Sequence, residues 1–127
     1  MGSAPQIVLI LAGLGFIGFG AAYTFWPARM ARLTDIGVPT ATARADFVAT
    51  YGGFQIGFGI FLLACARNHG WLAAGLWAVV AALGGFASGR AATTLLHRGQ
   101  VRRSIWFGLG LELSGLALSL WGLGQLR

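Results

Sequence analysis

The chain has 127 residues and a formal net charge of +6; hydrophobic residues make up 57% of it, while Asp, Glu, Lys and Arg make up only 9%. Soluble domains carry roughly 25% charged residues, so this composition excludes a water-soluble domain and indicates an integral membrane protein. A crossing takes about 20 helical residues, which leaves room for about four. We expect one all-α domain over residues 1–127, a four-transmembrane-helix bundle running up-down-up-down with short loops.

Four apolar segments give the expected spans in chain order, at about residues 7–26, 44–66, 71–92 and 105–124. The first stops at Pro27, and the second begins after a turn in which Thr40 and Thr42 are both candidate helix starts. The polar turn 67–70 is short enough to predict a helical hairpin, and the basic loop 97–103 precedes the fourth span.

The arginines predict an orientation. Most of them flank the first and third connections, namely Arg29, Arg32, Arg44, Arg98, Arg102 and Arg103. The opposite side holds only Arg67 and Arg127, so the positive-inside rule predicts cytoplasmic Arg-rich loops and both termini outside. Residues 1–6 lack a basic residue, so we expect the first span to be retained rather than cleaved. Pairing with anionic lipid headgroups accounts for the positive charge, and no nucleic-acid partner is expected.

The first span contains a G-x-G-x-x-G pattern at residues 13–18. A dinucleotide-binding unit needs further strands and helices to build its sheet, and the following residues form only membrane-length apolar runs. We interpret the pattern as a small-residue packing face that contains Gly13, Gly20 and Ala21. The tetrapeptide Ile-Gly-Phe-Gly occurs at 17–20 and again at 56–59, which we attribute to shared packing needs.

The second span has two polar or small faces. One face contains Arg44, Tyr51 and Gln55, and the other contains Asp46, Gly53 and Gly57. The G-x-x-x-G step formed by Gly53 and Gly57 predicts close helix packing. Asp46 either sits favourably in the first helical turn or acts as a ligand, and Arg44 either extends to the headgroups or forms an inward ion pair.

Glu112 lies near the centre of the fourth apolar run, where a charge costs at least ~2.5 kcal/mol, so it is a functional-site hypothesis. Its helical neighbours are small, namely Gly108, Gly115 and Ser119, which predicts close approach of another helix and an inward-pointing acid. We expect Tyr51 and Gln55 at similar depth, and Arg90 about 10 Å nearer the cytoplasm but within partial reach. The predicted inner polar cluster is Glu112, Gln55, Tyr51 and Arg90, with Arg44 and Asp46 as further candidates.

Metal, cofactor and catalytic sites have little support in the sequence. His69 and His97 fall on opposite sides of the membrane in the predicted topology, so they cannot share a metal ion or haem. Cys65 is the only cysteine, which excludes an internal disulfide. No nucleophile has an expected base beside it. We therefore expect no metal, no cofactor and no enzymatic activity.

The segment 40–59, Gly89-Arg90 and Glu112 together resemble a bacterial family of small four-helix membrane proteins, domain of unknown function 4345. The resemblance covers almost the whole chain, and residues 44–59 are its most specific part. It implies a bacterial inner membrane location. It also implies that the family's recurring motif positions are Arg44, Asp46, Tyr51, Gly52, Gly53, Gly57, Arg90 and Glu112. The family supplies no known reaction.

Two functions fit these patterns. The first is non-enzymatic binding of a lipid, a hydrophobic small molecule or a partner helix through the inner polar cluster, which includes association into a homo-oligomer or with another membrane protein. The alternative is a small proton-coupled exporter or channel in which Glu112 exchanges a proton for a substrate. A purely structural role for Glu112, as a polar clasp between helices, also remains open.

Overall fold

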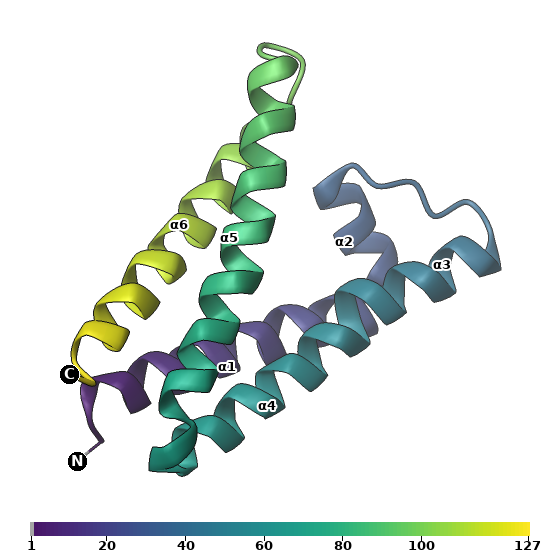
Figure 1. Cartoon of the computed structure of the whole chain (residues 1–127). Helices are drawn as coiled ribbons and strands as arrows, with labels where there is room; N and C mark the ends of the chain where they lie inside the picture. Colours follow the sequence, from purple (N-terminus) through teal and green to yellow (C-terminus); the bar gives the residue numbers. More distant parts are fainter. Residues whose placement is uncertain (1) are drawn as a thin grey trace. The chain divides into compact units, whose positions relative to one another are not determined.

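The computed structural model describes residues 2–127, and 85% of the chain is helical, with no strand in the described part. The elements (Figure 1) are α1 Ala4–Phe25, α2 Pro27–Thr34, α3 Ala41–Phe47, the π-helix η1 Val48–Gly53, α4 Phe54–Arg67, the 3-10 helix η2 His69–Trp71, α5 Leu72–Leu96 and α6 Arg103–Gly124. Four continuous helical segments are long and apolar enough to cross a membrane: Ala4–Phe25, Ala41–Arg67, His69–Leu96 and Arg103–Gly124. The prediction of an all-α chain with four membrane-length helices is confirmed.

The chain divides into two compact units. One unit comprises residues 10–64, with most of α1, α2, α3, η1 and most of α4. The other comprises residues 65–127 together with the N-terminal residues before Ile10, and contains α5 and α6. We call them the 10–64 unit and the 65–127 unit, and each is described by itself.

In the 10–64 unit, α1 and α4 cross antiparallel with their backbones in direct contact. A Cβ atom added to Gly59 would lie 2.5 Å from the carbonyl oxygen of Gly13, and one added to Gly20 would lie 2.8 Å from that of Gly52. Only glycine permits so close an approach, because any side chain there would overlap the opposing backbone. Gly13 and Gly20, predicted to lie on a packing face of the first span, therefore do so.

The repeated tetrapeptide lies at this crossing. A Cβ atom on Gly59 would lie 2.7 Å from Cγ1 of Ile17, and one on Gly20 would lie 2.8 Å from Cγ1 of Ile56. Each isoleucine thus packs over the glycine of the other copy. Because the helices run antiparallel, the same four residues can make reciprocal contacts, which supports the interpretation that the repetition reflects shared packing.

The second long helix is not a regular α-helix throughout. In η1 the backbone winds as a π-helix, and the N–H of Phe54 donates to the carbonyl of Ala49. A π-turn holds more residues per turn, so the seven-and-four spacing assumed for Arg44, Tyr51 and Gln55 does not persist across it. Such a turn leaves no clear mark in the sequence, because it forms from ordinary helix-compatible residues.

Gly52 in η1 and Gly59 in α4 make the close contact with α1, whereas helix packing was predicted for Gly53 and Gly57. Gly53 and Gly57 are exposed, and a Cβ atom on Gly57 would meet no atom within 4 Å. The glycines that meet α1 within this unit are therefore Gly52 and Gly59, and a packing role for Gly53 and Gly57 stays a prediction.

The short helix α2 was not predicted. Pro27 is its first residue, and the left-handed Asp35 ends it, with its N–H directed at the carbonyls of Ala31 and Arg32. α2 packs onto a cluster built around the buried residues Tyr23, Ala31 and Phe47, with Met30, Ile36, Val38, Val48 and Tyr51 around them. A helix of only about two turns that begins at a proline and contains arginines looks like an irregular connection in the sequence, so α2 was not recognised as a helix.

Helix ends differ from the expected spans by a few residues. Thr40, rather than Thr42, caps the second long helix, because its side chain accepts a hydrogen bond of 3.1 Å from the N–H of Ala43. α1 begins before the predicted residue 7, α5 continues past residue 92 to Leu96, and α6 begins at Arg103. The helices extend beyond the apolar runs because the backbone hydrogen bonds of a helix can continue through polar residues.

In the 65–127 unit, α5 and α6 form an antiparallel hairpin. A Cβ atom on Gly115 would lie 2.5 Å from Cδ1 of Leu83, and one on Gly122 would lie 3.3 Å from Cδ2 of Leu76. Near the start of α5, Gly75 packs closely against Cys65 and Leu9. The small residues of α6 thus lie along its contact with α5 and set the register between the two helices.

Candidate functional site

The central feature of the 65–127 unit is an ion pair between Arg90 on α5 and Glu112 on α6. Nε of Arg90 donates to both carboxylate oxygens at 3.0 Å, and Nη2 donates to Oε1 at 2.7 Å. Hydrogen bonds between charged groups at these distances are among the strongest in proteins, and the planar guanidinium holds the carboxylate in one orientation. The two side chains therefore join α5 to α6 within their membrane-length segments.

The hairpin register brings Arg90 much closer to Glu112 than expected. Glu112 lies about three residues farther from the connection along α6 than Arg90 does along α5. At the rise of an α-helix, this is an axial offset of about 4.5 Å rather than the expected 10 Å. Helical side chains lean toward the N-terminus of their own helix. In an antiparallel hairpin, Arg90 leans away from the connection and Glu112 leans toward it, which closes the remaining distance.

Gly108 makes room for the pair one turn before Glu112. A Cβ atom on Gly108 would lie 3.6 Å from Cζ of Arg90 and 3.7 Å from its Nε, so the guanidinium packs against the backbone of α6. A longer side chain at this position would occupy the space of the guanidinium. Gly108 and Gly115, both predicted to be packing residues, thus contact α5 on either side of Glu112.

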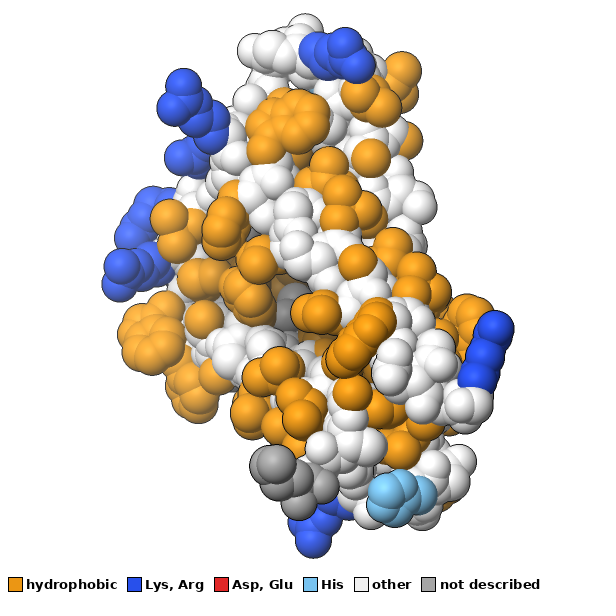
Figure 2. Space-filling view, turned by 90° about the vertical axis from the view of Figure 1, so that its left-hand side faces the viewer, with side chains coloured by type: hydrophobic (Ala, Val, Ile, Leu, Met, Phe, Trp, Pro, Cys, Tyr) orange, Lys and Arg blue, Asp and Glu red, His pale blue; other side chains and the backbone are white. Residues whose placement is uncertain are grey.

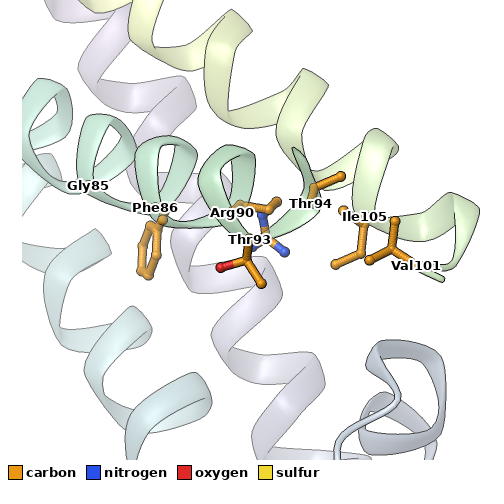
Figure 3. Close-up of a pocket in the computed structure, with 8 residues that line it drawn as sticks. Gly85, Phe86, Arg90, Thr93, Thr94, Val101 and Ile105 are labelled. Atoms are coloured by element: carbon orange, nitrogen blue, oxygen red, sulfur yellow. The ribbon is translucent and has the colours of Figure 1, made fainter. Parts of the chain in front are cut away.

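An open pocket of about 390 Å³ lies beside the pair (Figure 3). It is lined by Gly85, Phe86, Gly89, Arg90, Thr93, Thr94, Val101 and Ile105. The side chain of Arg90 is 33% exposed, whereas that of Glu112 is 11% exposed and does not line the pocket. We call this space the Arg90 pocket. Its wall is mainly apolar, and the guanidinium is its charged group.

The remaining members of the predicted cluster lie in the 10–64 unit. The ring of Tyr51 stacks on that of Tyr23 with centroids 5.4 Å apart and contacts Phe47 at 5.1 Å. Gln55 is half-buried in α4, while Arg44 and Asp46 are exposed in α3. An aromatic environment for Tyr51 was missed, although Phe47 one turn earlier could have indicated it. The association of these four residues with Glu112 stays a prediction.

A second pocket of about 410 Å³ lies in the 10–64 unit, between α2 and the connection to α3. It is lined by Ala28, Ala31, Arg32, Asp35, Ile36, Gly37, Val38 and Arg44. The pocket forms where the chain returns after α2, a helix that was not predicted, so no sequence pattern indicated it. Within residues 2–127, no three His, Cys, Asp or Glu side chains gather as a metal site.

The outer surface defines the class of protein. Large hydrophobic side chains on each of the four long helices are 57% to 70% exposed, for example Leu11, Ile60, Trp77 and Phe107. On the face shown in Figure 2, hydrophobic side chains predominate. Apolar surface on this scale, on helices of membrane length, is typical of a multi-pass membrane protein, because lipid covers it more favourably than water does.

The chain belongs to the family described as Domain of unknown function (DUF4345), whose sequence model matches residues 4–123. The family resemblance noted from the sequence is therefore confirmed over nearly the whole chain. Comparison with curated proteins and with solved structures finds no match.

Proposed function

We propose that this multi-pass membrane protein binds a lipid or a hydrophobic small molecule in the Arg90 pocket and does not catalyse a reaction. One observation carries the proposal: Arg90, on a helix of membrane length, is held by Glu112 and yet one third exposed in a mainly apolar pocket. A cation within a membrane span is costly, and such residues are mostly functional.

The Arg90–Glu112 pair supports binding over proton-coupled export. Exchange of a proton at Glu112 would break three short hydrogen bonds in every cycle. A binding role keeps the pair intact and uses Glu112 to hold the guanidinium in position for a ligand. A partner helix, from a second copy or from another membrane protein, is the competing occupant, since Gly85 and Gly89 form a G-x-x-x-G step in the pocket wall.

Native mass spectrometry of the detergent-purified protein tests the proposal. We expect the wild type to retain lipid or another small molecule of a few hundred daltons. Gly89→Leu should abolish this retention, because the new side chain enters the Arg90 pocket, where no atom lies within 4 Å of the added Cβ. Gly110→Leu is the matched control, since Gly110 is also exposed and free of neighbours but does not line the pocket.

A protein that carries no small molecule, or equal retention by Gly89→Leu and the wild type, would contradict the proposed binding site. Retention of a second subunit without any small molecule, lost in Gly89→Leu, would instead assign the pocket to a partner helix.

We further propose that the protein resides in a bacterial inner membrane with both termini outside and the Arg-rich connections in the cytoplasm. The support for this orientation is the excess of arginines around the first and third connections, which the positive-inside rule assigns to the cytoplasm.

A further inference from the structure

The pocket beside α2, which we call the α2 pocket, is held in place by a buried cluster. Its lining residue Ala31 is 3% exposed and belongs to the same cluster as Tyr23 of α1 and Phe47 of α3. α2 ends at the left-handed Asp35, and the N–H of Ile36 donates to the carbonyl of Ala31 at 2.9 Å. The cluster and this hydrogen bond therefore fix both α2 and the start of the connection that follows it.

The wall of the α2 pocket carries an excess of one positive charge. Arg32 and Arg44 contribute two cations and Asp35 one anion, while the other lining residues are apolar or glycine. Arg32 and Asp35 each have further interactions. The side chain of Arg44 is exposed and makes no hydrogen bond or ion pair within residues 2–127. Arg44 is therefore the cation of this wall that a ligand can neutralise.

The α2 pocket lies between the ends of two helices of membrane length. Its lining residues follow Phe25, where α1 ends, and reach Arg44 in the first turn of the segment 41–67. Phe25 and Trp26 are 70% and 60% exposed, which is typical of aromatic side chains at a membrane surface. A ligand therefore meets this pocket at the level of the lipid headgroups, whichever side of the membrane the connection occupies.

A phosphodiester fits this charge pattern. It carries one negative charge, so its binding leaves the wall neutral as a whole, and its two free oxygens match the planar donor fork of Arg44. Two nearby charges do not line the pocket, namely Arg29 on α2 and Asp46 on α3, and they are opposite in sign. Basic pockets beside membrane-spanning helices are a recurrent site for phospholipid headgroups.

We propose that the α2 pocket is a second binding site, which takes the phosphodiester of an anionic phospholipid with Arg44 as its anchor. The apolar residues Ile36 and Val38 of its wall provide surface for the glycerol backbone and the first carbons of the acyl chains. The α2 pocket shares no lining residue with the Arg90 pocket, so this site goes beyond the proposed function.

Phosphatidylglycerol and diacylglycerol with the same acyl chains differ by the phosphate headgroup and test this site. Each is added at the same mole fraction to delipidated wild-type protein, and the bound fraction is measured by native mass spectrometry. We expect phosphatidylglycerol to bind about tenfold more tightly, the effect of a hydrogen bond to a charged group. Glycerophosphoglycerol, the same headgroup without chains, should bind more weakly than phosphatidylglycerol.

Arg44→Gln removes the charge and the donor fork, and should abolish most of the preference for phosphatidylglycerol. Arg29→Gln is the matched control, because it removes the same charge from an exposed position on α2 that does not line the pocket. It should keep the preference. Both positions are exposed, so both variants should fold. Arg44→Lys should retain part of the preference, since lysine keeps the charge and loses the fork.

Equal losses of preference in Arg44→Gln and Arg29→Gln would show a diffuse attraction of anionic lipid and overturn the site. Equal binding of the two lipids by the wild type would overturn it as well. Binding of glycerophosphoglycerol as tight as that of phosphatidylglycerol would overturn the assignment to a lipid and indicate a soluble phosphodiester. The Arg90 pocket is intact in all these variants, so the proposed function is tested separately, by Gly89→Leu.

Discussion

Arg90 and Glu112 are opposite charges on neighbouring helices of membrane length, and each makes the other tolerable there. Glu112 was recognisable in the sequence because an acid within a long apolar run is rare. The pairing with Arg90 was not recognised as direct, because the expected distance did not include the tilt of helical side chains toward the N-terminus of their own helix. At this scale, the chemistry of a residue is visible in the sequence, but its distance from another residue is not.

Removal of Glu112 alone should destabilise the fold. Glu112→Leu leaves Arg90 without its carboxylate, and we expect the free energy of unfolding to fall by about 3 kcal/mol. The double variant Arg90→Leu/Glu112→Leu should recover most of this loss, because no uncompensated charge remains. Equilibrium denaturation in mixed micelles, followed by circular dichroism, measures both. A double variant as unstable as Glu112→Leu would show that packing at position 112, not charge, causes the loss.

Small residues determine how the elements pack. The crossing of α1 over η1 and α4 depends on close backbone contacts at Gly13, Gly20, Gly52 and Gly59. The sequence shows an abundance of glycine, but it does not show which glycines face a neighbouring helix. The π-turn η1 adds to this difficulty, since it changes the angular relation between residues before and after it.

Gly59 and Gly57 make a matched pair for testing this packing. A Cβ atom on Gly59 would collide with the backbone of α1, so Gly59→Ala should lower the free energy of unfolding by about 1–3 kcal/mol. Gly57→Ala meets no atom within 4 Å and should change stability by no more than about 0.5 kcal/mol. Denaturation in the same mixed micelles compares them. Equal losses from both substitutions would contradict the assigned contact.

At the scale of the whole molecule, arginine placement predicts how the chain crosses the membrane. The connections before the second and fourth long helices carry most of the positive charge, and charges close to span ends govern orientation. The short helix α2 and the loop after α5 hold these arginines next to the membrane-length segments. The predicted orientation therefore rests on a few arginines at known positions.

Cysteine labelling in spheroplasts of an expressing bacterium tests the orientation. In a Cys65→Ala background, Gln125→Cys should react with a membrane-impermeant maleimide, whereas Gln100→Cys should react only after permeabilisation. Both glutamines are exposed, so a difference in labelling reports the side of the membrane. The reverse pattern would place the Arg-rich connections outside and contradict the positive-inside assignment.

The sequence by itself determined the class of protein, the four membrane-length helices and the glycine-rich segments, and it marked Glu112 as a candidate residue, because apolar run length and residue chemistry are local properties. Only the tertiary structure decided that Arg90 binds Glu112, that Gly52 and Gly59 form the contact with α1, and that Tyr51 stacks with Tyr23. These facts depend on the register between helices, the extra residue in the π-turn and the direction of side chains. All three are set when helices pack together.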